Sequence, residues 1–163
     1  MKKILTVVIL TFLCALRVSA QDSKSYTEIP ELDKFVGEWV YSSKGKSLKL
    51  FLTKEKTYVG PLDSYVDALV GYYDYKPDKS STLGDKDKNR IIAGRLVEVY
   101  GDAVTFLVTD SKKSKIGRAT LNLVPNNPSQ AEFSIGELEG VKVKETSTPG
   151  FSLPSGVILK KVE

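Results

Sequence analysis

The chain has 163 residues, and its 24 basic and 20 acidic side chains give a formal net charge of +4. It contains no histidine and a single cysteine, Cys14. Ser-His-Asp and Cys-His nucleophile systems are therefore excluded, as are the usual zinc sites built from these two residue types. We expect no metal or cofactor and no catalytic residue, so binding is a better hypothesis than catalysis.

The first twenty residues have the pattern of a secretory signal peptide. Lys2 and Lys3 form a basic start, residues 4–16 are apolar, and small side chains precede Gln21. The apolar run is shorter than the ~20 residues that span a membrane, so no transmembrane segment is expected after cleavage. The sequence thus predicts an exported protein, periplasmic or extracellular, that loses residues 1–20.

Cleavage would change the composition. It removes Cys14 together with Lys2, Lys3 and Arg17, so 21 basic and 20 acidic residues stay and the net charge falls to +1. A near-neutral chain without thiols has no strong attraction for nucleic acid or anionic lipid, and it forms no disulfide. Its length fits one domain. The oligomeric state is not indicated.

The elements follow in chain order. Residues 21–30 are polar and aperiodic and are expected to be a flexible lead-in. Pro30 with acidic neighbours predicts a short helical turn to Phe35. After it, strand patterns separated by turn signals cover residues 39–41, 46–54, 64–76, 91–100, 103–109, 118–124, 132–138, 141–144 and 156–162.

Turns recur roughly every 8–12 residues, which is typical of an antiparallel barrel or sandwich. We therefore expect an all-β fold of eight to ten strands, one domain at residues 31–163, preceded by the helical turn. Gly71, within the longest strand, indicates a bulge or a sharp bend. The side chains expected to fill the interior are Leu48, Leu50, Val66, Val70, Tyr72 and Phe106.

Aromatic side chains are the main binding candidates. Trp39 begins a strand, and by itself it is expected to be an ordinary core residue with one polar N–H group. Tyrosines occupy both faces of the strand at residues 64–76, so some are expected to line a cavity or an exposed patch. The alternative is one core face and ordinary surface tyrosines on the other. The ligand-binding or barrel-plug candidates are Trp39, Tyr65, Tyr72, Tyr73 and Tyr75.

Charged clusters are weaker signals. Residues 85–89 imitate the first half of a calcium loop, but Arg90 stands where glycine belongs and Leu96 where the bidentate glutamate belongs. Scattered carboxylates leave a carboxylate-dependent hydrolase as an alternative without singling out a pair. The one local basic cluster, interpreted as a charged hairpin tip, consists of Lys112, Lys113, Lys115 and Arg118.

Residues 32–39, which end in Gly37-Glu38-Trp39, resemble the opening of lipocalins and fatty-acid-binding proteins. There a helical turn leads into Gly-x-Trp, the tryptophan plugs one end of the barrel, and the interior binds a small apolar ligand. Lipocalins usually pair this tryptophan with an arginine near the last strand, and residues 156–163 contain none. The resemblance implies a non-enzymatic barrel that takes a small apolar or amphipathic ligand.

A second resemblance covers residues 31–39, 50–54, 65–70 and 158–161. These segments look like a family of small exported Bacteroidota proteins of unknown function, which implies export and a β fold but no activity. Two binding hypotheses stay open. The first is a ligand-binding barrel. The alternative is an envelope or secreted interaction module with a filled core, which acts on a protein through its surface.

Overall fold

The computed structural model describes residues 24–78, 90–93, 99–138 and 149–162. The expected signal peptide, the calcium-like segment at residues 85–89 and the expected strand at 141–144 lie outside these ranges. The described residues form ten strands and two short 3-10 helices, which confirms the all-β prediction. No helix among them is long and apolar enough to cross a membrane.

The elements are short apart from one long hairpin. The helix η1 begins at Pro30 and ends at Phe35, where the sequence predicts a helical turn. The order is β1 (Tyr26–Thr27), η1 (Pro30–Phe35), β2 (Gly37–Ser43), β3 (Lys46–Val59), η2 (Gly60–Leu62), β4 (Ser64–Lys76), β5 (Arg90–Ala93), β6 (Val99–Tyr100), β7 (Ala103–Asp110), β8 (Lys115–Val124), β9 (Asn127–Gly136) and β10 (Val157–Lys161).

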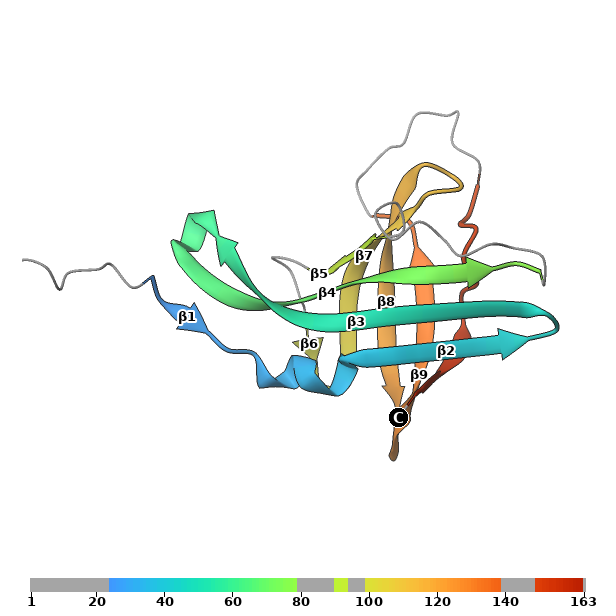
Figure 1. The fold of residues 1–163 in the computed structure, drawn as a ribbon, viewed down its shortest axis with the longest axis horizontal. Helices are drawn as coiled ribbons and strands as arrows, with labels where there is room; N and C mark the ends of the chain where they lie inside the picture. The colour runs from blue at the N-terminus through green and yellow to red at the C-terminus, as the bar shows by residue number, and fades with distance from the viewer. Residues whose placement is uncertain (1–23, 79–89, 94–98, 139–148, 163) are drawn as a thin grey trace, which may run out of the picture.

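Eight of the described strands pair in a ring. The sheet runs in the order β4-β3-β2-β10-β9-β8-β7-β5, and β5 pairs back onto β4. Every pairing in the ring is antiparallel. The closing strand β5 is short, with four register pairs to β4 and two to β7. The long strands therefore form a half-barrel, and β5 closes it into the predicted barrel (Figure 1).

Apolar side chains from both halves of the ring pack together in the interior. The largest fully buried ones are Trp39, Phe35 and Phe133. They belong to one core cluster that draws on η1, on the loop before β10 and on all eight ring strands. The described ring strands therefore share one contiguous core.

The interior face of β4 differs from the prediction. Leu50 pairs with Tyr73, and because opposite residues of an antiparallel ladder share a face, Tyr73 and Leu69 enter the core. The expected interior residues on β3 and β7 are buried: Leu48, Leu50 and Phe106. Those on β4 lie on the other face and are only half-buried, so their placement was wrong: Val66, Val70 and Tyr72. The three errors have one cause. The two faces of β4 were assigned one residue out of phase, so side chains expected on the inner face lie on the opposite one.

Gly71 marks a close approach of β3 and β4. It pairs with Leu52 in a register that continues without a shift, so the expected bulge is not present in this ladder. A Cβ atom at Gly71 would lie only 1.8 Å from the carbonyl oxygen of Phe51. The glycine is required because the neighbouring backbone occupies the space of a side chain.

Gly71→Ala is therefore expected to destabilise the barrel by about 3 kcal/mol, because a backbone atom must move to admit the methyl group. Gly136→Ala, on β9, is the control, since a Cβ there meets nothing within 4 Å. Urea unfolding followed by Trp39 fluorescence measures both. Equal stability of the two variants would contradict this role of Gly71.

Candidate functional site

Trp39 lies where η1 meets the start of β2. Its side chain is fully buried, and its Nε1 donates a hydrogen bond to the carbonyl oxygen of Phe35 at 2.8 Å. Phe35 and Leu32 of η1 pack in the same core cluster. The indole thus joins the helix to the barrel, and it lines neither of the surface depressions described below.

A lysine on the last strand accompanies this tryptophan. Lys161 of β10 is the register partner of Trp39, and its Nζ lies 5.4 Å from the centre of the ring system. The same Nζ donates a hydrogen bond to the carbonyl oxygen of Lys34 at 3.0 Å. The sequence expectation considered only arginine in the last strand and therefore missed Lys161. Any cation in that strand would have been a sufficient signal.

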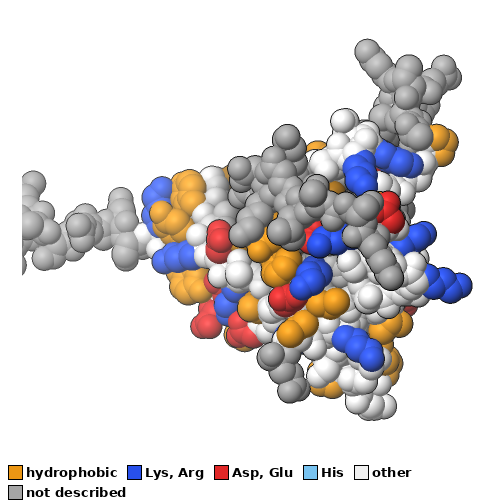
Figure 2. All heavy atoms as spheres, turned by 45° about the vertical axis from the view of Figure 1, so that its right-hand side comes forward, with side chains coloured by type: hydrophobic (Ala, Val, Ile, Leu, Met, Phe, Trp, Pro, Cys, Tyr) orange, Lys and Arg blue, Asp and Glu red, His pale blue; other side chains and the backbone are white. Residues whose placement is uncertain are grey.

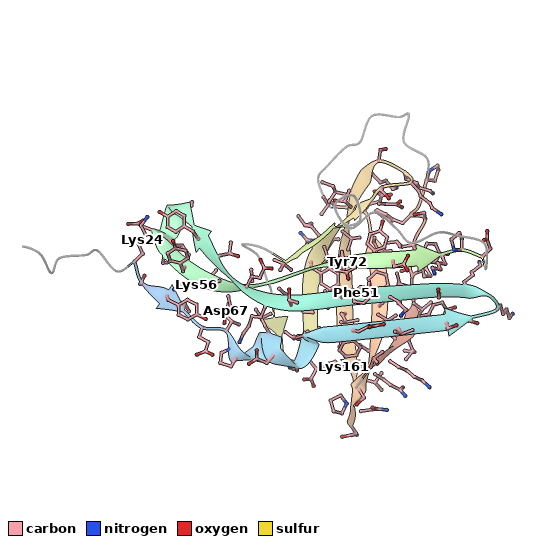
Figure 3. All side chains as sticks on the ribbon, viewed as in Figure 1. Lys24, Phe51, Lys56, Asp67, Tyr72 and Lys161 are labelled. Atoms are coloured by element: carbon pink, nitrogen blue, oxygen red, sulfur yellow. The ribbon has the colours of Figure 1, made fainter. Side chains whose placement is uncertain are left out.

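The four tyrosine candidates do not form one site. Tyr73 is buried and donates to a backbone carbonyl of β7 at 3.0 Å, and burial raises the pKa of its phenol. Tyr75 packs against the core. Tyr72 stacks on Phe51 on the opposite face of the sheet, with ring centres 4.5 Å apart (Figure 3). Tyr65 lies apart from these, beyond the barrel.

Described residues line two open depressions on the barrel surface. One of about 550 Å³ lies between β2 and β10 and is lined by Tyr41, Ile158 and Lys160 among others. The other, of about 380 Å³, lies beside Phe151 and Ile135. None of the five aromatic candidates lines either depression, so neither depression coincides with the predicted ligand site.

Beyond the barrel, β3 and β4 continue as a projecting hairpin. The last pair of β3 with β2 is at Leu52, and β5 pairs with β4 from Leu69 onward. Residues 53–68, which we call the arm, extend away from the ring, and β1 lies along the β4 side (Figure 1). No arm residue belongs to the core cluster. The arm is therefore not needed to fill the barrel.

The inner face of the barrel continues along the arm with a different chemistry. Lys56 lies opposite Asp67, and Tyr58 lies opposite Tyr65. The register is continuous, so these residues share the face that carries Tyr73 into the core. Where the barrel ends, this face changes from aliphatic to aromatic and charged.

Asp67 fastens the N-terminal segment to the arm. Its side chain is 4% exposed and accepts hydrogen bonds from the Tyr26 hydroxyl at 2.6 Å and the Ile29 amide at 2.9 Å. Lys54 Nζ lies 3.5 Å away. The Tyr26 hydrogen bond above all holds the pKa of this carboxyl below its usual value, although burial opposes it. The lead-in expected at residues 21–30 thus includes a short strand and an anchored amide.

A second cluster braces the tip of the arm. Lys24 Nζ lies 3.0 Å from the Asp63 carboxylate and donates to the Tyr58 hydroxyl at 2.9 Å. The Tyr58 hydroxyl in turn donates to Asp63 at 2.6 Å. Hydrogen bonds from Tyr58 and Lys24 lower the pKa of Asp63, and those to Tyr58 and Asp63 raise the pKa of Lys24. Both groups are fully ionised at neutral pH and hold the tip together.

Aromatic side chains of the arm are exposed beside lysines. Lys56 Nζ lies 4.6 Å from the Tyr26 ring centre and 4.8 Å from that of Tyr65, within the range of cation–π contacts. Tyr26 is 46% exposed, Tyr58 43% and Leu62 66%. Figure 2 shows hydrophobic and lysine side chains together at this end of the molecule. The arm thus carries exposed rings whose positions are fixed by neighbouring lysines.

The arm carries no excess of positive charge. With the attached residues 24–29 it has three basic and four acidic side chains, which are Lys24, Lys54, Lys56, Glu28, Glu55, Asp63 and Asp67. A surface for nucleic acid or anionic lipid needs a clear cationic excess. The balance therefore argues against a polyanionic ligand at the arm.

The basic cluster is only partly a solvated hairpin tip. Lys115 is buried, pairs with Glu137 at 2.7 Å and has its Nζ 4.2 Å from the Phe151 ring centre. Asp110, which is fully buried and lies opposite Lys115 in the β7–β8 ladder, accepts hydrogen bonds from the Ser152 amide and hydroxyl, each at 2.6 Å. These charges join the β7–β8 turn to the loop before β10. Among the described residues no group of three or more acidic side chains could hold a metal ion.

Fold and surface together define an all-β barrel protein with a braced aromatic arm. The chain belongs to DUF6705, a family of unknown function, whose family model matches residues 1–85. The match includes the whole arm and β1. No curated protein and no solved structure matches the chain. Membership of a family of unknown function is thus confirmed.

Replacing Lys161 by methionine keeps its aliphatic length and removes the charge and the hydrogen bond. We expect Lys161→Met to lose about 1 kcal/mol of stability, the usual value of one such bond. Lys161→Arg should stay close to the natural protein, because it restores both contacts. Thermal unfolding followed by Trp39 fluorescence measures the difference, and identical curves for the two variants would contradict the pairing.

Asp67→Asn should loosen the N-terminal segment at neutral pH. We expect amide exchange of Ile29 to accelerate about tenfold, the effect of losing one charge-assisted hydrogen bond. Glu55→Gln, an exposed acid on the same arm, is the control and should leave Ile29 protection unchanged.

The same amide should respond to pH. Because folding lowers the pKa of Asp67, its contribution is complete above the unfolded carboxyl value of ~4 and is lost as pH falls through the folded value. The protection factor of Ile29 is expected to be constant from about pH 7 to 5 and to fall below about pH 4. An equal pH response in Asp67→Asn would exclude Asp67 as its source.

Proposed function

We propose that this protein is an exported, non-enzymatic interaction module that binds a protein partner through the arm. In this proposal residues 1–20 are a signal peptide, and the mature chain works in the periplasm or outside the cell. Its resemblance to small exported Bacteroidota proteins supports that location. The partner is an envelope or secreted protein.

The packed core cluster supports surface binding over a ligand inside the barrel. Trp39, Tyr73 and the aliphatic side chains of the ring pack against one another in a single cluster. The depressions of about 550 and 380 Å³ are open at the surface instead. A small apolar ligand is better held by a largely enclosed pocket.

The arm has the composition of a protein-binding surface. Tyrosine supplies a large contact area with few rotatable bonds, and it is enriched among residues that dominate binding energy. Tyr26 and Tyr58 are exposed, yet their hydroxyls are held by Asp67 and Asp63. This preorganisation is the observation that carries the proposal, since little side-chain entropy is lost on binding.

The two acidic side chains that brace the arm are not suited to act as a catalytic acid. A catalytic acid needs a raised pKa. Asp63 and Asp67 have lowered pKa values, because each carboxylate accepts hydrogen bonds that hold the arm. They stabilise the surface and are not free to exchange protons with a substrate near neutral pH.

Replacing both Tyr26 and Tyr58 by alanine should remove partner binding. Affinity-tagged protein is crosslinked in the cells that produce it, and the co-purified partner is quantified. We expect at least about a tenfold loss, as for truncation of central interface residues. The control is Ile116→Ala on β8, a side chain 51% exposed and remote from the arm. Retention in the double variant, or an equal loss in the control, would refute the arm as the site.

The natural protein, purified from the same cells, also tests the rival hypothesis. Native mass spectrometry should give the mass of the polypeptide alone, because side chains fill the interior. A stoichiometric small molecule released on unfolding would contradict surface action and support the ligand-binding barrel.

A further inference from the structure

One edge of the arm pairs with no strand in the described part of the chain. β2 stops pairing with β3 at Leu52, whereas β3 continues to Val59. On its other side β3 pairs with β4 along the whole arm, and β1 covers part of the far edge of β4. Among the described residues, positions 53–59 of β3 therefore have a strand on one side only (Figure 1).

An open edge presents backbone donors and acceptors to another strand. We call residues 53–59 at this open edge of β3 the strip. The strip carries Lys54, Glu55 and Lys56 in succession, followed by Thr57 and Tyr58. Its charges oppose indiscriminate pairing, because like charges placed directly opposite destabilise a ladder. They leave pairing open to a strand whose own charges fall in complementary positions.

We propose that the strand which fits this edge is the same strip of a second copy of this chain. In the proposed dimer the two β3 edges pair antiparallel about a two-fold axis, with Thr57 opposite Thr57 of the second copy. The inference goes beyond the proposed function, since it requires no other protein.

Charge selects this register. A two-fold axis normal to an antiparallel pair places one residue opposite itself. Centring the pair on Lys54, Glu55 or Lys56 puts identical charges face to face. Centring it on Thr57 puts Lys56 opposite Tyr58 and Glu55 opposite Val59, and it joins two threonines, a favourable cross-strand pair. Centring the antiparallel pair on Tyr58 also avoids like charges, but it pairs only the residues at the tip of the arm.

The pairing would extend the binding surface. Opposite residues share a face, so Lys56 of each copy would lie beside the exposed Tyr58 ring of the other. The two arms would form one continuous sheet with the tyrosines of both copies on the same side. A ladder of about five residues is smaller than the ~1,200 Å² of a stable interface, so we expect association that rises with concentration.

Covalent trapping tests this register. Cys14→Ser removes the only natural cysteine, and Thr57→Cys is introduced in that full-length background. In the dimer the two Cα atoms at position 57 would be about 4.5–5.5 Å apart, within reach of a disulfide. Thr53→Cys is the control on the same face of the same strand, where the two copies would be ~27 Å apart. Mild oxidation should give at least about tenfold more disulfide dimer with Thr57→Cys.

Equal crosslinking at the two positions, or none at position 57 in a folded variant, would overturn the dimer. If Thr57→Cys does not fold, sedimentation velocity of the unmodified protein takes its place. A dimer fraction that grows with concentration and disappears in Lys56→Gly is expected, because glycine inside a strand weakens the edge that pairs. A single monomeric species at all concentrations would contradict the proposal.

The dimer and the proposed function can fail separately. Thr57→Cys combined with the two tyrosine-to-alanine changes should still crosslink, because the backbone ladder is intact, while partner binding is lost. If the partner binds but Thr57→Cys does not crosslink, the dimer proposal is contradicted and the proposed function stands. If Thr57→Cys crosslinks but no partner co-purifies, the proposed function is contradicted and the dimer proposal stands.

Discussion

The unbroken register of the β3–β4 hairpin is the constraint on which the rest of the structure depends. Thirteen consecutive pairs run from Ser47 with Lys76 to Val59 with Ser64. Because the ladder has no shift, the face that fills the barrel is the same face that carries the arm's tyrosines and lysines. Gly71 lets the strands approach closely where barrel gives way to arm. The core and the candidate binding surface are therefore two halves of one ladder.

Local sequence signals were sufficient for the fold class. Pro30 marks η1, and Lys44-Gly45 and Gly101-Asp102 mark two-residue turns between paired strands, with positive φ at Lys44, Gly45 and Gly101. The face of β4 was not predictable in this way, because neither of its faces carries a charged residue over residues 68–73. The pairing with β3 decides which face of β4 points into the core, because the buried Leu50 lies opposite Tyr73.

The candidate site was predictable only in part, because its contacts join distant positions. Tyr65 was singled out as an aromatic residue, whereas Asp67 acts through Tyr26, 41 positions earlier. Lys161 reaches the carbonyl oxygen of Lys34 across 127 positions. The outer half of β3 was missed for another reason. Residues 54–59 have no aliphatic face, so their alternation did not resemble a strand, although Thr57, Tyr58 and Val59 favour one.

Core and arm thus have separate physical tasks: the core cluster lies in the barrel, and hydrogen bonds and ion pairs with residues 24–29 hold the arm. The most direct test replaces residues 55–68 by Asn-Gly, a two-residue hairpin turn. Urea unfolding is followed by Trp39 fluorescence. The account predicts a cooperative transition with the buried-tryptophan signal of the natural protein before it. An unfolded chain, or an exposed Trp39 without denaturant, would contradict the separation of scaffold and binding surface.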